Sequence, residues 1–347
     1  MGIQQSTPVK KILAVRNDKL GDLLVTLPGI ACIKKNLPQA RISVLVPEYT
    51  RDIALLCPDI DDVVVDPGRE NGLPATLQLS RMLHNGKFDA VVTFFSTGHV
   101  GLAVWLARIP YRLAPATKIA QFAYNHCLKQ RRSQSTKPEY EYNLDLARQF
   151  LADMGTKSIE NPSPPYLAIA PDTRQQARAS LLARHHIPEN AKLIFLHAGS
   201  GGSSNNLSLG QYAKLVHELD LSNPYHLILS AGPGELERIK RLSGMINGVP
   251  HTIYESTEGL SKFVEYIANA DLFIGGSTGP LHIAGALDVP TAAFYVRLRT
   301  SSALRWQTIN SPERRLAFSP EEDFGEEDMS GVDLAGAAAK IKATFLV

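Results

Sequence analysis

The sequence is poor in cysteine, and its three cysteines (Cys32, Cys57 and Cys127) lie far apart and outside any C-x-x-C pair. Neither a disulfide framework nor a zinc site is indicated, and a reducing compartment fits best. No run of about 18 apolar residues occurs. The first residues also lack the apolar core of a signal peptide, which argues against secretion. We therefore expect a cytoplasmic protein.

An excess of charge of one sign is also missing, because 36 basic residues face 34 acidic ones. Nucleic acid is thus not an expected partner. The sequence contains neither the G-x-G-x-x-G pattern of dinucleotide-binding folds nor a Walker A pattern. Asp59-Ile60-Asp61 forms a D-x-D string that could hold a divalent cation, but it lies in a turn before a strand. We expect no metal and no cofactor.

What the sequence does contain is a repeated alternation of short apolar strands with helix-length amphipathic segments. The alternation predicts parallel sheets with helices between the strands. It runs through residues 11–16, 41–46, 63–65 and 90–94, and it starts again through 192–197, 226–230, 271–275 and 291–296.

The 347 residues suit two domains of ordinary size. A proline-rich connector at 161–171 separates the two series of strands, since these prolines fit neither a helix interior nor a central strand. We predict an α/β protein with a first domain over 1–165 and a second over 166–330. A closing helix within 331–347 is expected to pack back toward the first domain.

The loop after the first predicted strand places Asp22 near a helix start at the carboxyl edge of the sheet, where ligands of such folds bind. Two interpretations stay open. Aspartate is a common N-cap that accepts backbone N–H bonds. The alternative role for Asp22 is that of a general base.

The second half repeats this layout twice with chemistry suited to an anion. His197 is followed by A-G-S-G-G-S-S, in which Ser200, Gly201 and Gly202 could bring backbone N–H groups and a hydroxyl close to phosphate. A plain surface loop is the alternative.

The turn at 275–282, read G-G-S-T-G-P-L-H, leads from a strand into a helix with Pro280 in its first turn. Ser277 and Thr278 could cap this helix while donating to phosphate oxygens, or could serve as a structural cap alone. His282 could face a ligand or be buried in the interior. In the turn G-P-G-E, Glu235 could accept from ribose hydroxyls or cap its helix.

Taken in order, V-R-N-D-K-L-G-D-L-L-V-T-L-P-G-I, H-A-G-S-G-G, the G-P-G-E turn and the segment A-D-L-F-I-G-G-S-T-G-P-L-H resemble glycosyltransferase family 9. This is the family of the lipopolysaccharide heptosyltransferases. The resemblance spans nearly the whole chain, and it is strongest at G-D-x-x-x-x-L-P (21–28) and S-T-G-P-x-H (277–282).

The resemblance implies a glycosyltransferase-B fold, with two Rossmann-like domains whose parallel sheets face a central cleft. It implies metal-independent, inverting transfer of a sugar, heptose from ADP-heptose, to a saccharide acceptor such as the lipopolysaccharide inner core. By the match, Asp22 is the catalytic base, and Asp18 and Lys19 are assigned to the acceptor. The residues assigned to the donor nucleotide and its diphosphate are Ser200, Gly201, Gly202, Glu235, Ser277, Thr278, Gly279, His282 and Arg297.

Two departures from the family pattern bear on the donor. Many members carry Lys or Arg shortly after the H-x-G-S loop, where this chain has the uncharged 205–208, N-N-L-S. Many also carry Asp before T-G-P, where this chain has Gly276 and Ser277. We expect Arg297 or Arg299, which follow a strand at the ligand edge, to replace the missing cation.

Other functions remain open from sequence alone. A glycolipid acceptor would make the protein peripheral to the inner membrane. A local excess of basic residues in the first domain could contact anionic sugar or phospholipid. Alternatively, these basic residues form an ordinary solvated surface. These basic residues are Lys118, Lys129, Arg131, Arg132 and Lys137. A nucleotide-sugar 2-epimerase shares the fold, and a degenerate member would bind sugar or nucleotide without transferring.

Overall fold

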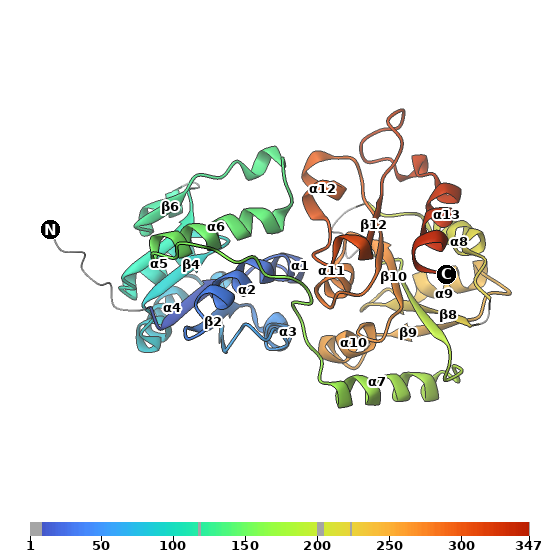
Figure 1. The fold of residues 1–347 in the computed structure, drawn as a ribbon, viewed down its shortest axis with the longest axis horizontal. Coiled ribbons are helices and arrows are strands. Elements are labelled where there is room, and N and C mark those ends of the chain that lie inside the picture. The colour runs from blue at the N-terminus through green and yellow to red at the C-terminus, as the bar shows by residue number, and fades with distance from the viewer. Residues whose placement is uncertain (1–8, 117–118, 200–204, 223, 347) are drawn as a thin grey trace. The chain divides into compact units, whose positions relative to one another are not determined.

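The computed structural model describes residues 9–116, 119–199, 205–222 and 224–346. The chain divides into two compact units (Figure 1). The first comprises 1–132 and 139–166, and the second comprises 133–138 and 167–347. The short segment 133–138, which the sequence analysis placed inside the first domain, groups with the second unit.

The first unit is a six-stranded sheet in the order β3-β2-β1-β4-β5-β6, and every neighbouring pair is parallel. This is the doubly wound order of Rossmann folds. Its strands are β1 (Lys11–Val15), β2 (Arg41–Val46), β3 (Asp62–Val65), β4 (Ala90–Thr93), β5 (Tyr111–Pro115) and β6 (His126–Leu128). Its helices are α1 (Leu20–Leu24), α2 (Leu27–Asn36), α3 (Arg51–Ala54), α4 (Gly72–Gly86), α5 (Gly98–Leu106) and α6 (Glu139–Asp153), with short 3-10 turns η1 (Glu48–Thr50), η2 (Arg69–Asn71) and η3 (Ile119–Ala123). The 3-10 turn η4 (Arg132–Gln134) begins at the last residue of 1–132 and continues into 133–138.

Both faces of this sheet are buried, as its apolar strands require. Leu13 and Val15 pack with α4 and α5. Ile12 and Ala14 are equally buried, and alternation along the strand turns them to the opposite face. α2 and α6 pack against each other, and Asn143 of α6 donates to the carbonyl of Val25 over 3.0 Å.

The second unit repeats the topology with the order β12-β11-β10-β7-β8-β9, again fully parallel. Its strands are β7 (Lys192–His197), β8 (Tyr225–Ala231), β9 (His251–Glu255), β10 (Leu272–Gly276), β11 (Thr291–Phe294) and β12 (Arg315–Phe318). Its helices are α7 (Pro171–Arg184), α8 (Leu209–Leu219), α9 (Leu236–Met245), α10 (Leu260–Ile267), α11 (Gly279–Ala286), α12 (Ala303–Trp306) and α13 (Leu334–Phe345), with 3-10 turns η5 (Arg299–Ser301), η6 (Pro312–Arg314) and η7 (Met329–Gly331).

The closing helix has a packing partner within the second unit. α13 packs against α8 in the second unit, where Leu334, Ala338 and Ile341 join the buried core formed by β7, β8 and β10. The apolar face of α13 is thus buried inside the second unit, and the expected packing of this helix toward the first unit stays a prediction.

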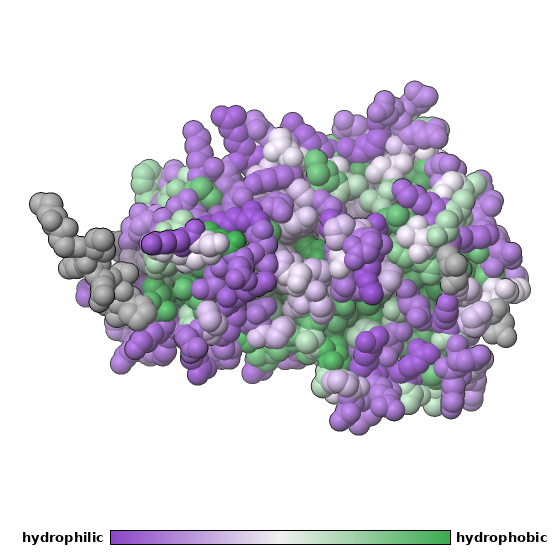
Figure 2. All heavy atoms as spheres, viewed as in Figure 1, coloured by the Kyte–Doolittle hydropathy of each residue, from purple (hydrophilic) through white to green (hydrophobic). Residues whose placement is uncertain are grey.

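Hydrophilic side chains cover much of the face drawn in Figure 2. Among the described residues, no helix has the length and apolar character needed to cross a membrane.

Candidate functional site

Doubly wound sheets bind ligands at the carboxyl ends of their strands, where the strand order reverses. In the first unit this point lies between β1 and β4, and in the second between β7 and β10. The loops that the sequence analysis singled out follow β1, β7 and β10. Each unit therefore presents its candidate residues at the edge where such folds bind.

Arg16 is the centre of a charged cluster in the first unit. It follows β1 directly, and its side chain is only 3% exposed. Its Nε donates to Asp18 Oδ1 over 2.8 Å and its Nη2 donates to Asp22 Oδ1 over 2.5 Å. One carboxylate from the loop after β1 and one from α1 are thus held by one buried guanidinium.

Glu139 extends this cluster from the first residue of α6. Its Oε1 lies 3.8 Å from Arg16 Nη1 and accepts from Arg132 Nη1 over 2.5 Å. The cluster therefore contains three carboxylates and two guanidinium groups. Buried charges are tolerated only with such compensation.

Asp22 lies in the first turn of α1, but it does not cap that helix. Lys19 occupies the N-cap position without a side-chain cap bond, and Arg16 holds Oδ1 of Asp22. Within the described residues, Oδ2 of Asp22 has no hydrogen-bond partner. The capping interpretation of Asp22 therefore does not hold in this structure, and an oxygen is left to receive a proton.

The pKa of Asp22 is raised to about 6. Burial is the largest cause, since it disfavours the charged carboxylate; Arg16 opposes it, while the carboxylates of Asp18 and Glu139 add to it. A carboxyl group with a pKa near the working pH is suited to general base catalysis.

The two residues assigned to an acceptor lie beside Asp22. The carboxylate of Asp18 is occupied by Arg16, and its backbone carbonyl accepts from Tyr49 Oη over 3.2 Å. Lys19 is exposed. Of the two, only Lys19 has its charged group directed to solvent.

A chain of hydrogen-bonded polar groups anchors the loop between β1 and α1. Asn17 donates to Asp66, which also contacts His99 Nε2 at 2.9 Å. His99 Nδ1 in turn lies 2.8 Å from Thr76 Oγ1. These contacts fix the chain between Arg16 and Asp18, although they were not anticipated from the sequence.

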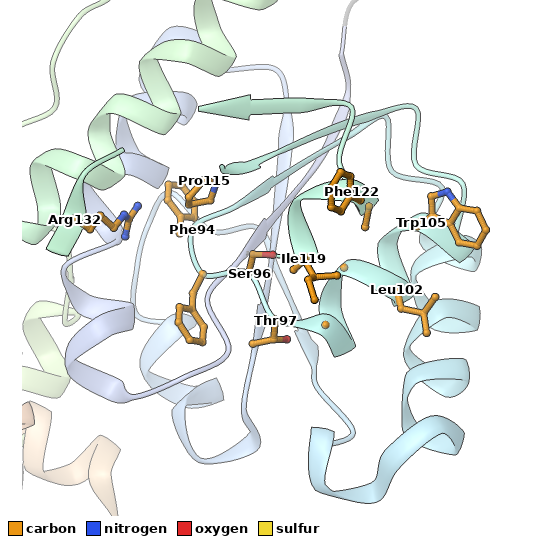
Figure 3. Close-up of a pocket in the computed structure, with 14 residues that line it drawn as sticks. Phe94, Ser96, Thr97, Leu102, Trp105, Pro115, Ile119, Phe122 and Arg132 are labelled. Atoms are coloured by element: carbon orange, nitrogen blue, oxygen red, sulfur yellow. The ribbon is translucent and has the colours of Figure 1, made fainter. Parts of the chain in front are cut away.

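A cavity of about 900 Å³ opens beside the cluster, over the carboxyl ends of β4 and β5 (Figure 3). Its lining is mostly apolar, with Ser96, Thr97 and Arg132 as polar exceptions. The ring of Phe95, also in the lining, lies 5.6 Å from the guanidinium carbon of Arg16. The cavity thus reaches the charged cluster.

In the second unit, the N-terminus of α11 carries unsatisfied polar groups. Thr278 is the N-cap residue, yet its hydroxyl makes no cap bond. Among the described residues, Thr278 Oγ1 and His282 Nδ1 are buried without a hydrogen-bond partner. Gly279 and Pro280 begin the helix, and Ser277 precedes Thr278. Free N–H groups at a helix start favour an anion.

His282 is buried in α11 with its ring near Trp306, at 6.2 Å between centroids. Burial lowers its pKa to about 4. The imidazole is therefore neutral at physiological pH, and one of its nitrogens can donate a hydrogen bond without carrying charge.

Glu235 lies close to the loop that follows β7. Its Oε2 accepts from the backbone N–H of Gly232 over 2.9 Å and lies 3.8 Å from His197 Nε2. A Cβ atom at Gly199 would lie 2.1 Å from Glu235 Oε1, so a larger residue there requires the Glu235 carboxylate to move. Burial lowers the pKa of His197, and Glu235 opposes that effect. Ser200, Gly201 and Gly202 lie outside the described residues.

Asn206 lies in the uncharged stretch 205–208 that follows β7. Its amide donates to Gly199 O over 3.1 Å, and its Oδ1 accepts from Tyr212 Oη over 2.6 Å. A Cβ atom at Gly276 would lie 2.5 Å from the same Oδ1. Asn206 therefore ties the end of the β7 loop to α8 and packs against the end of β10.

Arg238 is a cation near this loop that the sequence analysis missed. It lies in the first turn of α9, and its Nε donates to Ala198 O over 3.2 Å. A cation in the first turn of a helix is disfavoured by the helix dipole. The position of Arg238 shortly after the G-P-G-E turn could therefore have identified it from the sequence as a candidate binding residue. Arg297, by contrast, donates to the carbonyls of Glu322 and Phe324, at 3.0 and 2.5 Å.

The D-x-D string is engaged in local structure. Asp61 forms an ion pair with Lys34 at 2.7 Å and accepts from the backbone N–H of Ile42 over 2.7 Å. Within the described part of the chain, no group of three or more His, Cys, Asp or Glu is placed to hold a metal ion.

Comparison with known proteins gives consistent matches. Residues 76–321 match glycosyltransferase family 9 (heptosyltransferase). A Haemophilus influenzae protein named as a candidate glycosyltransferase is 42% identical over 326 residues, covering 94% of this chain and 93% of that one.

Solved structures match over nearly the whole length. A family 9 glycosyl transferase of Veillonella parvula aligns with a TM-score of 0.82, at 17% identity, covering 99% of both chains. The ADP-heptose lipopolysaccharide heptosyltransferase II of Escherichia coli aligns with a TM-score of 0.77, at 17% identity, covering 97% of this chain and 98% of that one. The predicted fold class, glycosyltransferase-B with two Rossmann-like units, is confirmed.

Proposed function

This chain belongs to glycosyltransferase family 9, and we propose that it is a metal-independent, inverting enzyme that transfers heptose from ADP-heptose to a saccharide acceptor. The observation that carries the proposal is the partly buried Asp22 carboxylate, whose side chain is 18% exposed. It lies at the carboxyl edge of β1 with a pKa of about 6 and one oxygen without a partner among the described residues.

In the proposed reaction, an acceptor hydroxyl attacks the anomeric carbon of the donor sugar. Asp22 takes the hydroxyl proton, and the bond from that carbon to the diphosphate oxygen breaks. General base catalysis of this kind contributes about 10²–10⁴-fold. Arg16 keeps Asp22 in place and limits the rise of its pKa.

The departing diphosphate needs compensation for its charge. The N-terminus of α11, with the hydroxyl of Thr278, supplies preorganised donors in place of a metal. Ser277, Gly279 and His282 complete this anion site in the proposal. Glu235 is assigned to the nucleoside, where its carboxylate would accept from ribose hydroxyls.

The donor and acceptor are inferred from relatives. The Escherichia coli enzyme with the same fold carries ADP-heptose and lipopolysaccharide in its name. We extend both to this chain, with the lipopolysaccharide inner core as acceptor and the cytoplasmic face of the inner membrane as the place of action.

A panel of donors tests the proposal. ADP-heptose is expected to raise Tm by several degrees, because a ligand at 100 times its Kd stabilises a fold by about 2.7 kcal/mol. UDP-, GDP- and CMP-sugars are expected to give smaller shifts. Stabilisation by UDP-sugars alone, with epimerisation in the absence of acceptor, would favour an epimerase; no shift with any donor would favour a non-catalytic binder.

Arg238 is the candidate for the cation missing from 205–208. Replacing Arg238 with glutamine is expected to weaken donor binding by about 10- to 100-fold, as loss of a charge-assisted hydrogen bond typically does. Isothermal titration with ADP measures the change.

Lys240→Gln is the matched control, since Lys240 lies on the same helix and pairs with the exposed Glu237. Equal ADP affinity in Arg238→Gln and Lys240→Gln would remove Arg238 from the donor site. The same titration on Arg297→Ala decides whether Arg297 takes that role instead.

A further inference from the structure

One segment of the chain, nearly all of it in the first unit, has an unusual distribution of charge. Residues 90–138 contain seven Lys or Arg and no Asp or Glu, while the rest of the chain contains 29 basic and 34 acidic residues. The nearly neutral total therefore conceals a basic stretch, in which Arg132 is already paired with Glu139. Such a stretch attracts an anionic surface and is repelled by a cationic one.

The same segment exposes large apolar side chains on two neighbouring elements. Trp105 of α5 is 54% exposed, and Ile119 and Phe122 of η3 are 84% and 81% exposed. Leu102 and Leu106 of α5 are exposed as well. We call these five residues the α5–η3 patch.

The two elements of the patch lie against each other. A Cβ atom at Gly101 of α5 would be 3.3 Å from Ala123 Cβ of η3. Figure 3 shows Leu102, Trp105, Ile119 and Phe122 around one cavity. The inward face of α5 is buried through Val100, Ala103 and Val104, so this helix is apolar on both sides. A helix that is apolar all round normally has a second partner.

We propose that the α5–η3 patch inserts into the headgroup region of an anionic lipid bilayer. Three observations favour a bilayer over a protein partner. All charged residues of the segment around the patch are basic. Tryptophan, here Trp105, is enriched at membrane interfaces. The exposed apolar side chains lie on one short helix and one 3-10 turn.

The cavity connects the α5–η3 patch with the charged cluster around Arg16. The role of membrane binding inferred from this connection rests on the proposed function. Four of the five patch residues line the cavity, namely Leu102, Trp105, Ile119 and Phe122. Phe95, which lies beside Arg16, lines it as well. A glycolipid held in the leaflet could thus present its sugar to Asp22 while its apolar part stays in contact with the patch.

Vesicle flotation tests the proposal directly. The full chain is expected to bind vesicles of equal parts phosphatidylcholine and phosphatidylglycerol, to bind pure phosphatidylcholine weakly, and to be released by salt. The double variant Ile119→Ser/Phe122→Ser is expected to bind the anionic vesicles with an affinity lower by about 10-fold or more.

Leu55→Ser/Leu73→Ser is the matched control, because both leucines are exposed apolar residues outside the patch. It is expected to bind like the native protein. The chain has two tryptophans, so the emission of a Trp306→Phe variant reports Trp105 alone. Anionic vesicles should shift that emission to shorter wavelength.

Several outcomes would overturn the proposal. They are equal binding by the two double variants, equal binding to both kinds of vesicle, an unshifted Trp105 emission, or concentration-dependent self-association that Ile119→Ser/Phe122→Ser abolishes. Donor titration separates this failure from failure of the proposed function. A docking defect leaves ADP affinity and transfer to a water-soluble acceptor unchanged, and it lowers transfer only to acceptor embedded in vesicles.

Discussion

Replacing Asp22 with asparagine is expected to lower kcat by about 10²–10⁴-fold while ADP affinity stays at the native value. Asparagine keeps the size of the side chain and can still accept a hydrogen bond from Arg16, but its amide cannot take a proton from the acceptor hydroxyl. The measurement is single-turnover transfer at saturating donor, together with an ADP titration of the same preparation.

Asp52→Asn serves as the control, since Asp52 is an exposed carboxylate on α3 of the same unit. It is expected to behave like the native enzyme. If Asp22→Asn retained near-native kcat, Asp22 would be a structural partner of Arg16 and the base would have to be sought elsewhere.

The pH profile adds a second readout to this prediction. Asp22 must be ionised to act as a base, and its pKa is about 6. The kcat/KM of the native enzyme is therefore expected to fall about tenfold per pH unit below 6 and to level off above it. The residual activity of Asp22→Asn should lack this acid limb.

The strands and ligand loops were predictable because their signals are local. An apolar run followed by the loop to Gly21-Asp22, or directly by 276–282, indicates a strand that ends at a ligand edge, and the fold confirms that placement. The catalytic and binding roles assigned to these residues stay predictions. Strands β5, β6, β9 and β12 were missed. β6, β9 and β12 are short or polar edge strands with a single neighbour, and β5 ends in proline.

The charged cluster could not be assembled from the sequence in the same way. Glu139 lies 123 positions after Arg16, and the chain passes through five strands before the two meet. Only tertiary packing of α6 beside β1 brings them together. The one local signal was Arg16 itself, a charged residue at the end of an apolar strand, where its burial requires anionic partners.

This dependence on Arg16 predicts the second large effect. Arg16→Leu is expected to lower the free energy of unfolding by about 3–5 kcal/mol near pH 8, because one buried and two partly buried carboxylates lose their shared cation. Urea unfolding monitored by circular dichroism measures the loss. Arg51→Leu, an exposed arginine on α3, is the control and is expected to unfold like the native protein.

The pH dependence of that loss separates electrostatics from packing. Arg16 lowers the pKa of Asp22, so its removal lets burial raise that pKa further above the unfolded value. A carboxyl with a raised pKa in the fold favours folding at low pH, and this contribution disappears as pH rises through the folded pKa. The deficit of Arg16→Leu should therefore be smaller at pH 5 than at pH 8, and its acid limb of kcat/KM should move to higher pH. Arg16→Lys keeps the charge but cannot donate to both carboxylates from separate guanidinium nitrogens. Its free energy of unfolding is expected to lie between those of the native protein and Arg16→Leu. A deficit that is equal at both pH values would show that Arg16 contributes packing alone.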